Sequence, residues 1–487
     1  MNRDAAIDRA TANDTFDLVV IGGGATGVGI AVDAATRGLG VCLLEKHDFG
    51  KGTSSRSTKL VHGGVRYLKQ LNVSLVKEAL HERDLLLKNA PHLVRDLPFV
   101  IPCYSTIEKA YYAVGLRAYD LLAGRHRFGR SHAVSRDEAV SHLPTLATAG
   151  LRGGVVYHDG QFDDARLLID LAKLATSHGA SLINYAPVVA IEKDAAGRAS
   201  GVRFVDLESG REHVVRARCV INAAGPFVDE LRKLDQPDAP SLVAASQGAH
   251  VVLDASFLGG ETALMVPKTP DGRVLFAIPW HGKVVVGTTD TPITSVSAEP
   301  TAFDEEIDFI LDTAGRYLSR KPSRADVLSV FTGIRPLVRP NANVRKTSSL
   351  SRDHTISISD SGLLTITGGK WTTYRHMAQD AVDRAIQLAS LSPSPCLTAD
   401  LPIPGTPAPD TPDDAFIEHT IRHEMARTVE DVLSRRSRLL LLDARAAIAL
   451  APHVASVLTR ELRHNDAWRA EQVRTFNSVA QTYLPRP

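Results

Sequence analysis

The chain has 487 residues, of which 44% are hydrophobic and 23% are charged, and 56 Lys and Arg against 55 Asp and Glu leave a formal net charge of +1. This length and composition exclude a disordered or fibrous protein and predict two or three folded domains. The balanced charge argues against nucleic acid as a partner, because nucleic-acid-binding domains usually carry a basic excess.

The cysteines and the chain start indicate a reducing compartment and no membrane-spanning segment. No C-x-x-C pair occurs among Cys42, Cys103, Cys219 and Cys396. We therefore expect no metal site and four buried, small apolar side chains. The start MNRDAAIDRATAND mixes acidic and basic residues and predicts neither a signal nor a transit peptide. No apolar stretch reaches the roughly 20 residues that cross a bilayer, so we expect a cytoplasmic chain with at most peripheral membrane contact.

Residues 16–45 predict a β-α-β unit that binds a dinucleotide. The strand FDLVVI is followed by the turn GGGATG, a helix rich in small residues, and a second strand, VCLLE. Gly22, Gly24 and Gly27 allow a tight turn and a close approach to a pyrophosphate, and Glu45 can accept hydrogen bonds from ribose hydroxyls. Glu45 also argues against NADP, whose extra phosphate it would repel. This fingerprint does not distinguish FAD from NAD.

Helices and strands alternate further along the chain. Asp163 or Asp164 is expected to cap a helix, three alternating segments between residues 188 and 217 predict a meander, and residues 243–291 predict a second, β-rich sheet. The later segment SGLLTITGGKWTTYRHMAQDAVDRAI predicts a strand followed by a helix that begins near Thr372. Such a helix directs its positive end toward a flavin ring, which favours FAD.

A linker and a helical region complete the predicted organisation. Seven prolines lie between Ser392 and Pro412, where they exclude helix interiors and central strands, and helical spacing follows to the end. We predict an α/β fold, with an FAD-binding Rossmann-like domain, an inserted, mainly β substrate domain and a helical C-terminal domain. The FAD-binding domain is assigned residues 14–95, 150–230 and 355–390, the substrate domain residues 96–149 and 231–354, the linker residues 391–412, and the C-terminal domain residues 413–487.

Five motifs resemble, in their order along the chain, the aerobic, quinone-linked family of FAD-dependent glycerol-3-phosphate dehydrogenases. They are IGGGATGVGIAVDAATRG at 21–38, TSSRSTKLVHGGVRYL at 53–68, IPWHGKVVVGTTD at 278–290, TGIRPL at 332–337 and GGKWTTYRHMA at 368–378. The resemblance implies oxidation of sn-glycerol 3-phosphate to dihydroxyacetone phosphate by hydride transfer to FAD, with the electrons passed to membrane quinone. The alternatives are an FAD-dependent amine or amino-acid oxidase, a glycerol-3-phosphate oxidase that uses oxygen, and a non-catalytic flavoprotein.

The resemblance also implies which residues bind the substrate. Arg335 and Arg352 are expected to hold the phosphate, because a planar guanidinium forms paired, charge-assisted hydrogen bonds to phosphate oxygens. Arg66 and Tyr67 are expected on the wall beside the flavin.

The expected catalytic residues are Arg335 and two candidates for removing the proton of the substrate hydroxyl. Histidine titrates near neutral pH, which favours His250, whereas Lys370 requires burial or a neighbouring cation to lose its proton. The sequence leaves this choice open. By the same resemblance, the cofactor is expected to contact Gly22, Gly24, Gly27, Glu45, Thr53, Ser54, Ser55, Ser57, His62, Gly64, Gly225, Gly369 and Thr372.

A basic segment with interleaved tyrosines, residues 109–130, is a candidate for contact with the inner face of the cytoplasmic membrane. Tyrosine favours the membrane interface and cations favour anionic headgroups. The basic side chains are Lys109, Arg117, Arg125, Arg127 and Arg130. The alternative is a buried helix with a solvated basic end. The oligomeric state stays open, and a homodimer is one possibility.

Overall fold

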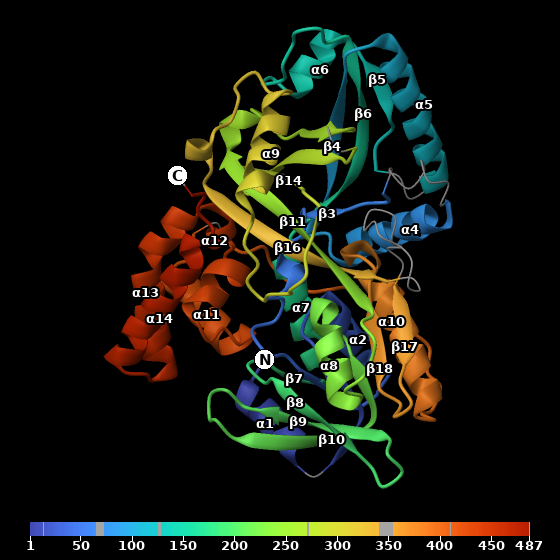
Figure 1. Cartoon of the computed structure of the whole chain (residues 1–487), viewed down its shortest axis with the longest axis vertical. Helices are drawn as coiled ribbons and strands as arrows, with labels where there is room; N and C mark the ends of the chain where they lie inside the picture. Colours follow the sequence, from blue (N-terminus) through green and yellow to red (C-terminus); the bar gives the residue numbers. More distant parts are fainter. Residues whose placement is uncertain are drawn as a thin grey trace.

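Two β-sheets and a group of C-terminal helices form the described part of the chain. The computed structural model describes residues 1–12, 14–64, 73–124, 128–269, 272–339, 354–409 and 411–486. In Figure 1 one sheet occupies the lower half of the molecule, the other occupies the upper half, and the C-terminal helices flank both. This arrangement confirms the predicted α/β class with a helical C-terminal region.

The first sheet has a parallel centre that contains the predicted β-α-β unit. Among the described residues its order is β17-β18-β10-β1-β2-β7, with β8 and β9 joined to β10. The strands are β1 (Thr15–Ile21), β2 (Val41–Leu44), β7 (Ser181–Ile183), β8 (Val188–Lys193), β9 (Ala199–Val205), β10 (Glu212–Asn222), β17 (Thr355–Ile358) and β18 (Leu364–Thr367). The antiparallel run β8-β9-β10 confirms the predicted meander.

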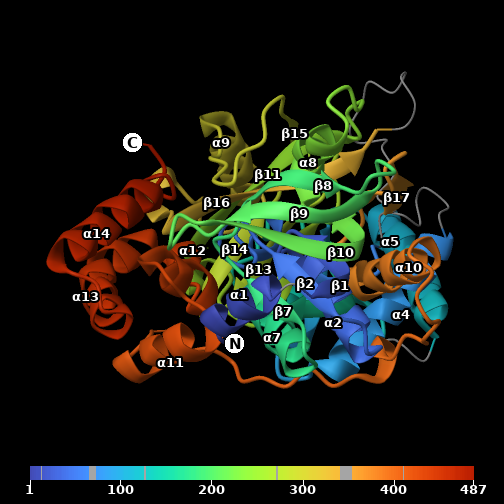
Figure 2. The same cartoon turned by 90° about the horizontal axis from the view of Figure 1, so that it is seen from below.

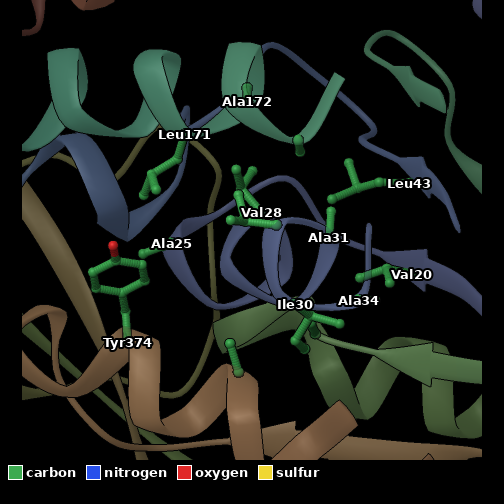
Figure 3. Packing of buried hydrophobic residues seen from close by; sticks show 14 of the residues in the cluster. Val20, Ala25, Val28, Ile30, Ala31, Ala34, Leu43, Leu171, Ala172 and Tyr374 are labelled. Atoms are coloured by element: carbon green, nitrogen blue, oxygen red, sulfur yellow. The ribbon is translucent and has the colours of Figure 1, made fainter. Parts of the chain in front are cut away.

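Helix α2 (Ala25–Thr36) is enclosed by α7 (Asp164–Ser177) and α10 (Tyr374–Leu388). Figure 3 shows Val28 and Ala31 of α2 between Leu171 of α7 and the strands, while Tyr374 of α10 approaches the opposite side. Small side chains on α2 let its neighbours approach closely and bury a large apolar area. This packing fixes the start of α2 at the end of β1, where the glycine turn lies.

The helix cap predicted at residue 163 or 164 is Asp163. Its carboxylate accepts a hydrogen bond from the backbone N–H of Arg166 at 3.0 Å, so it satisfies a donor in the first turn of α7. Asp164 begins the helix and forms a buried ion pair with Lys59. The two adjacent carboxylates therefore have different roles, and the sequence alone did not show which of them caps the helix.

The second sheet is mostly antiparallel. Among the described residues its order is β15-β11-β14-β13-β12-β4-β6-β3, with β16 beside β11 and β5 beside β6. The strands are β3 (Leu60–Val61), β4 (Val94–Cys103), β5 (His132–Val134), β6 (Gly153–Phe162), β11 (Val243–Asp254), β12 (Ala263–Val266), β13 (Leu275–Trp280), β14 (Lys283–Gly287), β15 (Thr291–Pro292) and β16 (Ser329–Val338).

Two strands of this sheet lie in ranges that were assigned to the FAD-binding domain. Strand β6 lies in the range 150–230 and β3 in the range 14–95, both of which were assigned to the FAD-binding domain. However, β6 pairs with β4 along its full length, from Val94 opposite Phe162 to Cys103 opposite Gly153, and therefore belongs to the second sheet. Strand β3 pairs with β6 in turn.

Several helices cover the sheets. α1 (Arg3–Thr11) and α8 (Val228–Asp235) border the first sheet, and α6 (Arg136–His142) and α9 (Asp304–Gly315) pack on the second. α4 (Val73–Asn89) and α5 (Thr106–Ala123) lie side by side at the edge of the molecule. Within the described ranges, no helix has the length and apolar character needed to cross a bilayer.

The C-terminal region consists of α11 (Asp414–Glu424), α12 (Leu439–Leu442), α13 (Ala444–Leu462) and α14 (Asp466–Gln481). Figure 2 shows them as one flank of the molecule. The first helix of the predicted helical region, α11, ends at Glu424, because Met425 has a left-handed backbone (φ 55°). A π-helical turn, residues 431–436, follows.

The predicted burial of the cysteines is correct for three of the four. Cys42, Cys103 and Cys219 are buried, whereas Cys396 is half-buried and lies 3.1 Å from the hydroxyl of Thr398. It differs because it belongs to the proline-rich segment, which runs along the surface.

Candidate active site

Two adjoining cavities lie between the sheets. One of about 410 Å³ follows the glycine turn of the first sheet, and one of about 280 Å³ extends under the second sheet. They share the wall residues Thr53, Pro336, Gly368, Gly369, Lys370 and Trp371. We call them the nucleotide cavity and the inner cavity. The shared wall places the two cavities side by side, and we refer to them together as the cleft.

The nucleotide cavity is built around the start of α2. Gly22 has a φ of 114°, and a Cβ there would lie 2.6 Å from the carbonyl oxygen of Ala223, so only glycine fits this turn. Gly24 is the residue before the helix and has no side chain with which to cap it, and the first helical N–H, that of Ala25, donates to the hydroxyl of Ser54. The helix start therefore presents backbone N–H groups and a positive dipole end to the cavity, which suits a pyrophosphate.

Glu45 lies at the end of β2 and lines the same cavity. Its carboxylate accepts hydrogen bonds from the backbone N–H groups of Gly23 at 2.6 Å and His47 at 2.8 Å. Burial raises the pKa of Glu45 and these two hydrogen bonds oppose that rise. The residue is thus oriented where a dinucleotide ribose is expected, and the cavity fits FAD.

The loop after Glu45 joins the two cavities. The hydroxyl of Ser54 accepts a hydrogen bond from the backbone N–H of Ala25 at 2.9 Å, and the indole of Trp371 donates to the carbonyl of Ser54 at 2.8 Å. The Thr53 hydroxyl donates to the carbonyl of Ile334 at 2.6 Å. This loop therefore ties the helix start of the first sheet to strand β16 of the second.

Arg335 on β16 lines the inner cavity, and its side chain is 21% exposed. Its guanidinium lies 3.2 Å from a carboxylate oxygen of Asp290 and donates to the hydroxyl of Thr288 at 3.1 Å. A Cβ at Gly248 would lie 2.7 Å from a guanidinium nitrogen. The glycine therefore provides the space in which the guanidinium lies against β11.

His250, also on β11, lines the inner cavity and is 2% exposed. Its Nε2 lies 2.9 Å from the hydroxyl of Thr58, and its ring stacks on Phe331 at 4.7 Å. Burial lowers the pKa of His250 well below the usual value, with further lowering by the positive charges of Arg335 and Lys59. The imidazole is therefore neutral at neutral pH and retains a lone pair for a proton.

A buried ion pair supports the Thr58 side of this arrangement. Neither Lys59 nor Asp164 has an exposed side chain, and the ammonium nitrogen lies 2.8 Å from both carboxylate oxygens. The ammonium also lies over the rings of Trp280 and Phe331, at 4.9 and 5.1 Å. The pair fixes the backbone next to Thr58.

Most of the predicted site residues come together in the cleft. Those that line it are Gly22, Gly24, Glu45, Thr53, Ser54, Ser57, His62, Gly64, Gly225, His250, Arg335, Gly369, Lys370 and Thr372. Gly27 and Ser55 line neither cavity. Gly27 packs against the Gly22 carbonyl, and the carbonyl of Ser55 accepts a hydrogen bond from Lys59. Arg66, Tyr67 and Arg352 lie outside the described residues.

Sequence reasoning missed several polar residues of the inner cavity. Thr58 and Asp290 stand inside motifs quoted for the family resemblance, so the motifs themselves were the available signal. Lys59 stands in the same motif as Thr58, but its pairing with Asp164 carried no signal, because it depends on contact between residues 105 positions apart.

Comparison with known proteins assigns the class. Residues 17–375 match the family described as FAD dependent oxidoreductase, which agrees with the glycine turn, Glu45 and the shape of the cleft. The protein is an FAD-dependent oxidoreductase. Residues 396–469 match the C-terminal domain of alpha-glycerophosphate oxidase.

Individual relatives narrow the class to a family. The chain is 40% identical to the mitochondrial glycerol-3-phosphate dehydrogenase of Macaca fascicularis, over 97% of this chain and 74% of that protein. It is 47% identical to a mitochondrial glycerol-3-phosphate dehydrogenase of Arabidopsis thaliana, over 83% and 66%. The glycerol-3-phosphate dehydrogenase of Bacillus halodurans complexed with FAD has a TM-score of 0.81 at 28% identity, covering 99% of this chain and 98% of that one. The chain belongs to the FAD-dependent glycerol-3-phosphate dehydrogenase family.

Proposed function

We propose that this protein oxidises sn-glycerol 3-phosphate to dihydroxyacetone phosphate and passes the electrons to a membrane quinone. The observation that supports this most directly is the inner cavity, which combines a guanidinium, Arg335, with a buried neutral imidazole, His250, next to the nucleotide cavity. A phosphate and a secondary hydroxyl on one small substrate require these two groups. FAD supplies the hydride acceptor when it is bound.

Each polar side chain of the inner cavity has its own role in the proposed reaction. Arg335 binds the phosphate through charge-assisted hydrogen bonds, in an orientation set by Asp290 and Thr288. His250 accepts the hydroxyl proton at Nε2 by way of the Thr58 hydroxyl, which lies 2.9 Å from that nitrogen and relays the proton. Lys370 stands on the wall shared by both cavities and positions the substrate oxygen.

The activity is tested by anaerobic addition of glycerol 3-phosphate to the FAD-loaded protein. We expect the flavin absorbance near its visible maximum to bleach with glycerol 3-phosphate and to persist with glycine or sarcosine. Bleaching by an amine alone would support an amine or amino-acid oxidase, and no bleaching by any of the three would support a non-catalytic flavoprotein.

The acceptor is tested separately, because an L-alpha-glycerophosphate oxidase of Mycoplasma pneumoniae shares the fold, with a TM-score of 0.61 at 18% identity. We expect turnover with a soluble quinone analogue to exceed turnover with oxygen by at least tenfold. Faster turnover with oxygen, with peroxide as product, would replace the quinone with oxygen as acceptor.

We also propose peripheral attachment to the inner face of the cytoplasmic membrane through α5. Helix α5 lies at the outer edge of the molecule in Figure 1. Four of its apolar side chains follow helical spacing along one side and are 82%, 57%, 69% and 82% exposed: Ile107, Tyr111, Val114 and Leu121. Apolar side chains next to the exposed Arg117 suit an anionic bilayer surface, whereas the ammonium of Lys109 lies against Gly153 of β6. Arg125 and Arg127 lie outside the described residues.

Co-sedimentation with anionic phospholipid vesicles tests this attachment. Replacement of Ile107 and Leu121 by Ser should reduce the bound fraction severalfold. The matched control replaces Leu207 and Val214, which are 52% and 47% exposed elsewhere, and should leave binding unchanged. Equal binding by both double variants would contradict the assignment to α5.

A further inference from the structure

The loop that carries Glu45 is held from outside the FAD-binding sheet, by the C-terminal helices. On its inner side, Lys46, His47, Gly50 and Lys51 line the nucleotide cavity. On its outer side, Asp48 is fully buried against the π-helical turn at 431–436. A loop that forms one wall of a cofactor site thus has its other face inside a different structural region.

Two arginines of that turn converge on Asp48. Arg435 donates to one carboxylate oxygen at 2.5 Å, and Arg436 donates to both oxygens at 2.5 and 2.9 Å. Both arginine side chains are at most 2% exposed. Burial alone would raise the pKa of Asp48, but the two guanidinium groups outweigh it and hold that pKa below its ordinary value.

A second ion pair reaches the loop three residues further on. The ammonium of Lys51 donates to both carboxylate oxygens of Glu430, at 2.6 and 2.5 Å, and Glu430 also accepts from Arg435 at 2.9 Å. Asp48, Arg435, Glu430 and Lys51 therefore form one connected network that spans the boundary between the regions.

A third link runs through Tyr185, which lies just after β7. The backbone N–H of Tyr185 donates to the carbonyl of His47 at 2.9 Å, and its hydroxyl donates to Asp431 at 2.7 Å. Three successive parts of the loop, at His47, Asp48 and Lys51, are thus anchored to residues 430–436. Burying several charged side chains close together costs solvation energy. The role of this network therefore lies in fixing the geometry of the loop more than in stabilising the protein.

We propose that Arg435, Arg436 and Glu430 are positioning residues for FAD, which hold the loop of residues 45–51 closed against the nucleotide cavity. They do not line the cavity and act on the cofactor only through Asp48 and Lys51. The C-terminal region is thereby a working part of the FAD site. The inference depends on FAD binding and not on the substrate or the electron acceptor.

The test compares two buried ion pairs that cross the same boundary. Arg435→Gln removes a contact to the loop. Arg166→Gln removes an equally buried pair, from α7 to Glu424 at 2.7 Å, that does not touch the loop. Each holoenzyme is diluted, and the release of FAD is followed by the rise of its fluorescence, while the melting temperature is recorded in parallel.

We expect Arg435→Gln to release FAD about tenfold faster or more, which is the lower range for loss of a charge-assisted hydrogen bond. Arg166→Gln should lower the melting temperature but leave the release rate within about twofold of the wild type, because the loop stays anchored. Equal acceleration by both variants, or by neither, would overturn the proposal.

A milder variant decides the question if Arg435→Gln fails to fold. The side chain of Glu430 is 15% exposed, so Glu430→Gln leaves less uncompensated buried charge. It should release FAD about threefold faster, as expected for a partly exposed ion pair. An unchanged release rate in this variant would refute the role of the network.

Discussion

Replacement of Asp164 by Asn should destabilise the protein strongly, because it leaves the ammonium of Lys59 buried without an opposite charge. Removing one partner of a buried ion pair costs about 3–5 kcal/mol. Lys59 would keep its hydrogen bond to the carbonyl of Ser55 at 2.7 Å and its contacts with two aromatic rings. These contacts place the expected loss near the lower end, at about 3 kcal/mol of the free energy of unfolding.

The loss should depend on pH in a defined direction. Burial already lowers the pKa of Lys59, and removal of the negative charge of Asp164 lowers it further. Between the folded and unfolded pKa values of Lys59 the unfolded state then binds more protons, so stability rises with pH. The variant should therefore lose less stability at pH 9 than at pH 7.

Urea unfolding at fixed FAD concentration measures this effect. The matched control is Asp312→Asn, because Asp312 pairs with Lys321 at 2.9 Å but both side chains are at least 60% exposed. We expect the control to cost less than about 1 kcal/mol. If both variants shift the unfolding midpoint equally, or if the loss in Asp164→Asn is the same at both pH values, the buried charge pair does not act as described.

Three further changes test the cleft. Gly248→Ala should lower kcat/KM about tenfold or more, because the new methyl group displaces the guanidinium of Arg335, and steady-state kinetics with intact FAD content would show it. Thr58→Val should reduce kcat while FAD content stays unchanged, because the Nε2 of His250 loses its partner; an unchanged kcat would contradict that role. Burial lowers the pKa of His47 to about 4, so stability falls as the pH drops from about 6.5 towards 4. His47→Gln should flatten that fall in denaturant titrations.

The nucleotide half of the site could be predicted from the sequence because it is encoded locally. Gly22, Gly24 and Glu45 lie within thirty residues, and the β-α-β geometry brings them together without help from the rest of the chain. The residue types also specify the chemistry, since a glycine turn at a helix start admits few other ligands.

The inner cavity could not be predicted in the same way, because strand register builds it. Pairing of β11 with β14 sets His250 opposite Gly287, and pairing of β11 with β16 sets His250 opposite Phe331 and Ser246 opposite Arg335. A shift by one residue would turn each of these side chains to the other face of the sheet. The family resemblance supplied His250 and Arg335, and no periodicity in the sequence did.

The electrostatic effect of Arg335 on His250 links substrate binding to proton removal. Burial and the charge of Arg335 lower the pKa of His250, so the free enzyme holds a weak base. A phosphate bound to Arg335 offsets that positive charge, and the pKa of His250 then rises in the complex, which strengthens it as a proton acceptor when substrate is present. The acid limb of kcat reports groups in the substrate complex, and that of kcat/KM reports groups in the free enzyme. In the wild type, His250 should therefore titrate at a higher pH in the profile of kcat than in the profile of kcat/KM. In Arg335→Gln the free enzyme lacks the depressing charge, so the acid limb of kcat/KM should move to higher pH. The phosphate of the substrate titrates near pH 6 in both proteins, so the difference between them isolates the histidine. If the acid limb of kcat/KM stays at the same pH in Arg335→Gln, the charge of Arg335 does not control the pKa of His250.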